Sequence, residues 1–158
     1  MKRSYIKRKP FKIAPRGQKL VSKRSKLAKK RKHRSEREIL HDRAWKLQSL
    51  AIRTEGMLEN GYNDCYTCGK YYHYTKLDAG HWKHGVCDFE PWNVHRQCSF
   101  YCNKINSGQR DIYMRRLQRE YGVDRVDQFE AYAHVKGNYY SVEQLQKVIN
   151  KYSSVEVV

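Results

Sequence analysis

Apolar residues recur at helical spacing in the segment that follows Ser35. Six of them fall on one predicted helical face: Ile39, Leu40, Ala44, Leu47, Leu50 and Ala51. Ser35 and Glu38 have the spacing of a capping box, in which the serine oxygen accepts from the Glu38 amide and the Glu38 carboxylate reaches back. Gly56 is a suitable stop signal, so the pattern predicts an amphipathic helix over residues 36–55.

The same periodicity appears three more times in the last third of the chain. A helix predicted over residues 109–121 places four apolar side chains on one side: Ile112, Tyr113, Leu117 and Tyr121. A shorter helix, residues 124–134, carries Val126, Phe129 and Tyr132. Ser141 and Gln144 form a second capping box, which opens a helix with a predicted buried stripe of Leu145, Val148, Ile149 and Tyr152.

Between residues 60 and 106 the periodicity gives way to Gly, Asn, Asp, Cys, His and aromatic residues. We expect short strands at residues 71–77 and 82–89, and Trp82 and Trp92 are expected to pack in a small core. The hydrophobic fraction of 39% is low, so an additional stabilising link, or staple, is expected to supplement that core. The predicted fold class is therefore α+β, with helices on both sides of a stapled centre.

Charge divides the chain into two unequal parts. Residues 1–35 contain 16 of the 33 Lys and Arg residues and no acid, whereas the remainder carries 17 basic and all 16 acidic residues. We expect the arm, residues 1–34, to be largely disordered when alone, because like charges repel and little apolar surface is available. A polycation of this kind indicates a nucleic-acid partner. The residues expected to contact phosphates are Lys7, Arg8, Lys9, Lys29, Lys30, Arg31 and Lys32. A solubility tail or a localisation signal is the alternative interpretation of the arm.

Compartment and membrane signals are also readable in the sequence. No run of 18 apolar residues is present, and no apolar segment follows the basic start, so we expect neither a membrane span nor secretion. Five cysteines in CxxC-type spacing indicate metal ligands in a reducing compartment.

Four of the cysteines have the spacing of a structural zinc site. Cys65 and Cys68 form a CxxC pair, and Cys98 and Cys102 form a CxxxC pair. Each pair can direct two sulfurs at one ion, so together they predict a closed tetrahedral Zn²⁺ site. Such an ion contributes on the order of 10 kcal/mol to folding, which would supply the missing staple. Cys87 is left over and is interpreted as an ordinary small side chain in a strand.

Residues suited to phosphodiester hydrolysis lie between and after the cysteine pairs. This reaction needs a base that activates water and a cation that neutralises charge on the phosphate. A histidine such as His81 is a suitable base. Asp78 and Asn103 offer the hard oxygen ligands that Mg²⁺ prefers.

The order of these residues resembles that of the HNH, or ββα-metal, nucleases. A CxxC pair is followed by His81, by Asn93 twelve residues later, and by Asn103 directly after the last cysteine. The segments LDAGHW, FEPWNVHRQC, CNKINSG and YMRRLQREYG are more specific. Over roughly residues 60–130 they are similar to the NinG (Rap) family of lambdoid phage recombination proteins. That family looks like structure-directed endonucleases that cut branched DNA, including Holliday junctions.

The resemblance implies a role for each matching residue. His81 would be the general base, Asn93 would pin the loop that orients the base, and Asn103 would bind the catalytic Mg²⁺ or Mn²⁺. Gly80 stands where many HNH enzymes have a metal-binding aspartate, so Asp78 is the expected substitute. The second cysteine pair is also one residue longer than is usual.

Four residues near the predicted site are candidate DNA contacts: His95, Arg96, Lys104 and Arg110. A structural hydrogen bond is an equally open interpretation for His95.

We therefore predict four regions: a DNA-binding arm at 1–34, an amphipathic helix at 35–59, a zinc-bound ββα-metal core at 60–122, and C-terminal helices at 123–158. The predicted function is metal-dependent, structure-selective cleavage of branched DNA in the cytoplasm of a bacterial host, beside phage or host recombination proteins. We also expect a homodimer, formed through the helix at 36–55 or the C-terminal helices. Two alternatives remain open: a non-catalytic zinc module that binds nucleic acid, and a homing or restriction-type HNH nuclease acting on duplex DNA.

Overall fold

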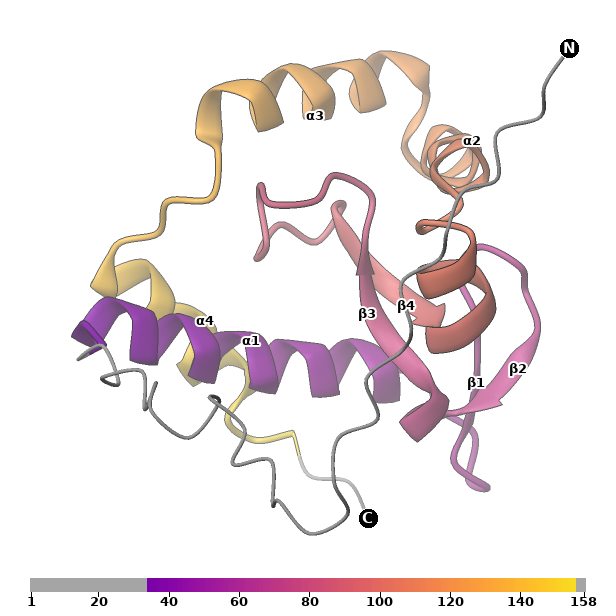
Figure 1. The fold of residues 1–158 in the computed structure, drawn as a ribbon, viewed down its shortest axis with the longest axis horizontal. Helices are drawn as coiled ribbons and strands as arrows, with labels where there is room; N and C mark the ends of the chain where they lie inside the picture. The colour runs from indigo at the N-terminus through magenta and orange to yellow at the C-terminus, as the bar shows by residue number, and fades with distance from the viewer. Residues whose placement is uncertain (1–33, 156–158) are drawn as a thin grey trace, which may run out of the picture. The chain divides into compact units, whose positions relative to one another are not determined.

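Two antiparallel hairpins form the strand structure of residues 34–155, the part of the chain that the computed structural model describes. In the first hairpin, β1 (Tyr62–Asp64) pairs with β2 (Tyr71–His73). In the second, β3 (Leu77–His81) pairs with β4 (Val94–Cys98), as Figure 1 shows. The seven basic arm residues predicted to contact phosphates, Lys7 to Lys32, lie outside the described residues.

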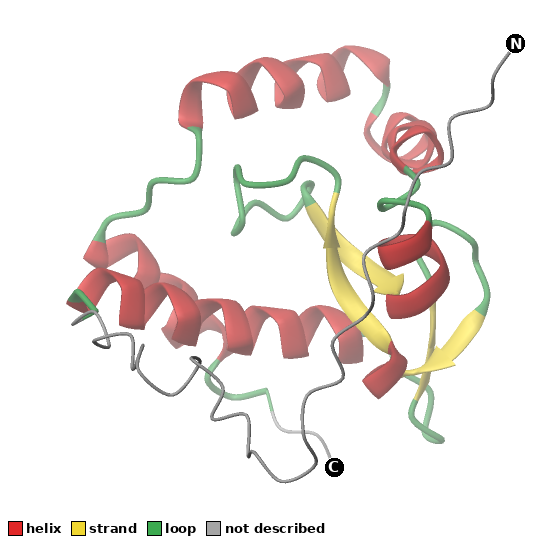
Figure 2. Cartoon of the chain, viewed as in Figure 1, coloured by secondary structure: helices red, strands yellow, loops and turns green. Residues whose placement is uncertain are grey.

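Helical segments precede, separate and follow the hairpins in the sequence, and Figure 2 shows them in red. Their bounds are α1 Glu36–Thr54, η2 Tyr74–Lys76, η3 Ser99–Ile105, α2 Arg110–Tyr121, α3 Val123–Lys136 and α4 Val142–Tyr152. The segment η3 is a π-helix, whereas η2 is a 3-10 helix. Helix α1 packs along α4 and also contacts β3 and β4 (Figure 1).

All four helices predicted from periodicity are present. Ser35 caps α1 and Ser141 caps α4, each in a complete capping box. The predicted stripe of α2 is only half right: Tyr113 and Leu117 are buried, but Ile112 and Tyr121 are 39% and 38% exposed. The apolar spacing therefore located the helix correctly while overestimating the width of its buried face.

The strand predictions need correction. Residues 82–89 form a loop and turns rather than a strand, while β1 and β4 are strands that the pattern did not predict. The segment 71–77 is divided among β2, η2 and the first residue of β3. Cys87 has a φ of 53°, in the left-handed region that a strand cannot adopt. It is fully buried in this loop, in one apolar cluster with Trp82 and Trp92.

The apolar core is divided into small clusters. One lies between α1 and α4 and contains Ala44, Tyr140, Leu145 and Ile149. Another joins the loop tryptophans to α2 and α3 through Tyr113, Leu117, Val126 and Ala133. The predicted dimer interface is the helix at 36–55 or the C-terminal helices. The stripes of α1 and α4 pack largely against each other within one chain, although Ile39 is 53% exposed.

The predicted fold class is confirmed: residues 34–155 form a mixed α+β structure with a cysteine cluster and flanking helices. The exact domain boundaries stay a prediction. Within the described range, no helix has the length and apolar character required to span a membrane.

Candidate metal centre and catalytic site

The four predicted zinc ligands come together. Cys65 and Cys68 lie in the turn between β1 and β2, Cys98 ends β4, and Cys102 lies in η3. Their sulfur atoms all lie within 4.8 Å of one another. In a zinc tetrahedron with Zn–S bonds of about 2.3 Å, sulfurs are about 3.8 Å apart, so this cluster could hold zinc. It ties the first hairpin to the second.

The additional residue of the CxxxC pair is accommodated by the π-helical form of η3. A π-helix, with its i→i+5 hydrogen bonds, is rare in proteins and is frequently found at functional sites. Cys98 is the N-cap of η3, and its Sγ accepts a hydrogen bond from the amide of Cys102 at 3.3 Å. The spacing that departs from the usual pattern thus has a local structural explanation.

The surroundings of the sulfurs favour a bound cation. Burial opposes ionisation of Cys65, but hydrogen bonds from Cys68, Thr67 and Cys98 outweigh it and lower the pKa of its thiol to about 7. The Cys98 amide donates a hydrogen bond to Sγ of Cys65 at 3.2 Å. Burial and neighbouring sulfurs raise the pKa of Cys68 and Cys102. Cys68 and Cys102 would become thiolates only with a cation that compensates this cost.

Asp78 and Asn103 form the second predicted cluster. Asp78 lies in β3, and Asn103 follows Cys102 directly in η3. The Asn103 Nδ2 donates a hydrogen bond to Oδ2 of Asp78 at 2.9 Å. A rotation of the Asn103 side-chain amide by about 180° would put its oxygen, instead of its nitrogen, beside the Asp78 carboxylate. A carboxylate and an amide oxygen suit Mg²⁺ or Mn²⁺, because such ions keep several waters and need few protein ligands.

His81 lies on the other face of β3. It is three residues from Asp78 in the same strand, so the two side chains point to opposite faces, about 10 Å apart along the chain. The imidazole stacks on Trp45 of α1 with ring centroids 4.8 Å apart. Its Nε2 lies 3.1 Å from Oδ1 of Asp88, and the side chain is 13% exposed. The structure therefore joins Asp78 to Asn103 but does not place His81 in contact with them.

Asp88 is a site residue that the sequence pattern did not identify. Its Oδ2 accepts from Asn138 Nδ2 at 2.6 Å and lies 3.4 Å from His41 Nε2 of α1. Burial opposes ionisation of Asp88, but the contacts with His81, Asn138 and His41 outweigh burial and lower its pKa. Asp88 thus links α1, the end of β3 and the connection between α3 and α4. No local signal marks it, because its partners are more than six residues away in sequence.

Asn93 holds the loop that connects β3 to β4. The residue is fully buried. Its Nδ2 donates to the carbonyls of Val86 at 2.8 Å, Lys83 at 3.1 Å and Cys87 at 3.2 Å. Its Oδ1 accepts from the Lys83 amide at 2.8 Å. These bonds fix the loop that carries Asp88 and follows His81, while the role of Asn93 in orienting a catalytic base stays a prediction.

His95 and Arg96 make internal contacts. The ring of His95 stacks on Tyr66 at 3.9 Å, and its Nδ1 lies 2.7 Å from the Tyr113 hydroxyl. Burial lowers the pKa of His95 to about 4. Arg96 pairs with the Asp64 carboxylate, and its Nε also donates to the Asp64 carbonyl at 3.0 Å. For His95 the structure shows the structural hydrogen bond, and a phosphate contact by Arg96 would require release from Asp64.

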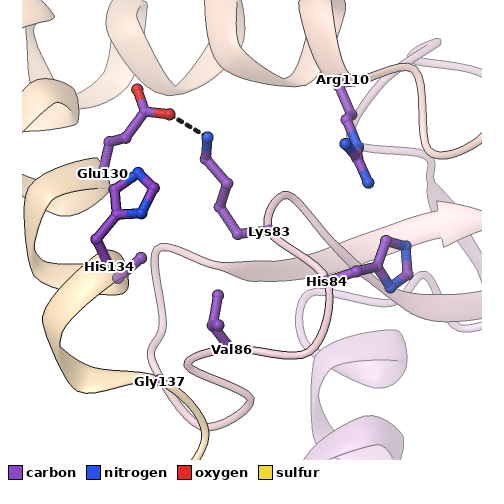
Figure 3. Close-up of a pocket in the computed structure, with 8 residues that line it drawn as sticks. Lys83, His84, Val86, Arg110, Glu130, His134 and Gly137 are labelled. Carbon is purple, nitrogen blue, oxygen red and sulfur yellow. Dashed lines mark hydrogen bonds and ion pairs between the residues drawn. The ribbon is translucent and has the colours of Figure 1, made fainter.

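Lys104 and Arg110 are exposed. Lys104 lies on η3 beside Asn103, and Arg110 is the first residue of α2. Arg110 also borders a cavity together with His84 and Lys83 (Figure 3). Both side chains remain candidates for phosphate contacts.

The fold and the cysteine cluster define a class: small α+β proteins in which four cysteines that could hold a metal ion join two hairpins. The chain belongs to the family described as "Bacteriophage Lambda NinG protein", which matches residues 2–156. Membership confirms the resemblance seen in the sequence and suggests a function related to phage recombination. Comparisons with curated proteins and with solved structures gave no significant match.

Proposed function

We propose that this chain is a metal-dependent, structure-selective endonuclease of the HNH type that cuts branched recombination intermediates such as Holliday junctions, flaps and D-loops. The observation that carries the proposal is the 2.9 Å contact between Asp78 and Asn103, directly beside the cysteine cluster. Family membership supports a role in recombination.

The two clusters would divide folding from chemistry. Zn²⁺ in the cysteine cluster would hold η3 against both hairpins and so fix the position of Asn103. Asp78 and Asn103 would hold Mg²⁺ or Mn²⁺, which supplies neutralisation of charge on the phosphate and on the departing oxygen.

His81 is the proposed base that takes a proton from the attacking water. With Nε2 directed at Asp88, Nδ1 is the ring nitrogen left to accept that proton. Within residues 34–155, β3 pairs only with β4, so one edge of β3 carries no strand. A phosphodiester that crosses this edge would be accessible to Asp78 from one face and to His81 from the other.

DNA would be held mainly by charge. If roughly eight arm residues contact phosphates, the log–log salt slope of binding would be about −7. Such contacts carry no sequence information, so selection by DNA shape is favoured. Symmetric resolution of a junction needs two cuts, for which we propose a homodimer with an interface outside the covered stripes of α1 and α4.

Cleavage of three synthetic substrates tests this function: a four-way junction, a flap and a linear duplex, each with Mg²⁺ or Mn²⁺. We expect cutting of the branched substrates and little cutting of the duplex. Equal cutting of the duplex would favour a homing or restriction-type nuclease. Binding without cleavage in any divalent metal would favour a non-catalytic zinc module.

A further inference from the structure

A basic cavity lies close to His81, because His84, one of its lining residues, is next to the His81 ring. It has a volume of about 270 Å³ and is bordered by the loop after β3, the start of α2, and α3. Figure 3 shows His84 and Arg110 directed at one side of the cavity and His134 and Glu130 at the other. The ring centroids of His84 and His81 are 5.5 Å apart. The His84 ring therefore lies between the cavity and the proposed base.

The charged groups of this cavity favour an anion. Glu130 is its one acidic lining residue, and Lys83 already pairs with it (Figure 3). Arg110 has no acidic partner within residues 34–155. His84 and His134 add imidazoles that can donate hydrogen bonds.

Positive charge in the cavity also acts on His84. Burial, then the proximity of His81 and Arg110, lowers the pKa of His84. A bound anion would offset the repulsion between these positive groups, and the same groups would attract the anion. A guanidinium beside an imidazole presents N–H donors suited to phosphate oxygens.

We propose that this cavity binds a phosphodiester of the DNA backbone next to the one that is cut. The inference deepens the proposed function, because it assigns the contact that would position the strand relative to His81. Arg110 is the main phosphate contact. Lys83 pairs with Glu130 and would contact the phosphate only if this ion pair were broken.

Equilibrium binding of the full chain to a four-way junction tests the Arg110 contact, measured over a range of salt concentrations without added Mg²⁺. Arg110→Ala should reduce the log–log salt slope by about 0.9, the value for one lost phosphate contact. Arg119→Ala is the matched control, because Arg119 is an exposed arginine on the same helix but does not border the cavity. Equal changes in both variants would overturn the proposal.

A charge-release variant gives an independent test. Glu130→Gln frees Lys83 and should steepen the slope by up to about 0.9 while tightening binding. Glu143→Gln is the control, since Glu143 also pairs with a lysine, Lys147, on α4 outside the cavity. No difference between the two variants would contradict the cavity assignment.

Both tests measure binding and do not require cleavage. Their results can therefore be distinguished from a failure of the proposed endonuclease function. A free anion is the competing occupant, and inorganic phosphate is its probe. If phosphate shifts the imidazole resonances of His84 and His134 while Arg110→Ala leaves the DNA salt slope unchanged, the cavity serves a free anion and the proposal is overturned.

Discussion

Nε2 of His81 lies 3.1 Å from Oδ1 of Asp88, and these two residues are the ends of a segment whose backbone carbonyls accept hydrogen bonds from Asn93. Nε2 is buried and makes no aligned hydrogen bond, but the neighbouring carboxylate would favour a proton on Nε2 over one on Nδ1. His41 approaches the other carboxylate oxygen at 3.4 Å. The orientation of the proposed base therefore depends on α1, an element well before the cysteine pairs in sequence.

Asp88→Asn should disturb this orientation. We expect ¹⁵N shifts of the His81 ring to show loss of the Nε2–H preference and the cleavage rate to fall at least about tenfold. Asp127→Asn, which changes an exposed carboxyl on α3, should do neither. A tautomer and a rate that both stay unchanged in Asp88→Asn would exclude Asp88 as a positioning residue.

Removal of zinc should unfold the centre of the molecule. Cys102→Ser is expected to lose bound zinc and with it on the order of 10 kcal/mol of folding free energy, measured by metal analysis and circular dichroism. Cys87→Ala is the control, because Cys87 is buried outside the cluster. Full zinc content in Cys102→Ser would contradict the four-cysteine site.

Stability should fall in acid because of His95. Its pKa is lowered to about 4 by burial, whereas an unfolded histidine titrates near about 6.5. Between these values the unfolded state binds a proton that the folded state does not, so stability decreases as the pH falls, by up to about 1.4 kcal/mol per pH unit. Urea unfolding should show that the stability of His95→Gln depends less on pH over this range than that of the unsubstituted protein. Any loss of zinc in acid would lower the stability of both proteins. Parallel pH curves would refute the assignment.

Asn93→Ala should destabilise the fold without touching either metal cluster. The substitution leaves the carbonyls of Lys83, Val86 and Cys87 without their donor, at an expected cost of about 3 kcal/mol. Asn150→Ala, at an exposed position of α4, should cost far less in the same denaturant titration. A similar cost for both would mean that the loop does not depend on Asn93.

The parts of the structure that local chemistry determines were predictable. Ser35 and Ser141 marked helix starts, because a capping box is a signal contained within four residues. The cysteine cluster followed from ligand spacing in the same way. Strand β4 was not predicted, since Val94–Cys98 consists mainly of polar side chains that are buried by contacts with distant segments. Asp88 was missed for the same reason, because its partners meet only in the folded chain.

We propose that Asp78 and Asn103 form the catalytic metal site. Single-turnover cleavage of a four-way junction by Asn103→Ala tests it most directly, with zinc content confirmed in the same sample. Asn106→Ala, an exposed asparagine directly after η3, is the control for local disruption. We predict that Asn103→Ala retains zinc and junction binding but loses cleavage by at least about a hundredfold, and that Asn106→Ala cuts normally. Undiminished cleavage by a zinc-loaded Asn103→Ala would exclude Asn103 as a ligand of the catalytic metal.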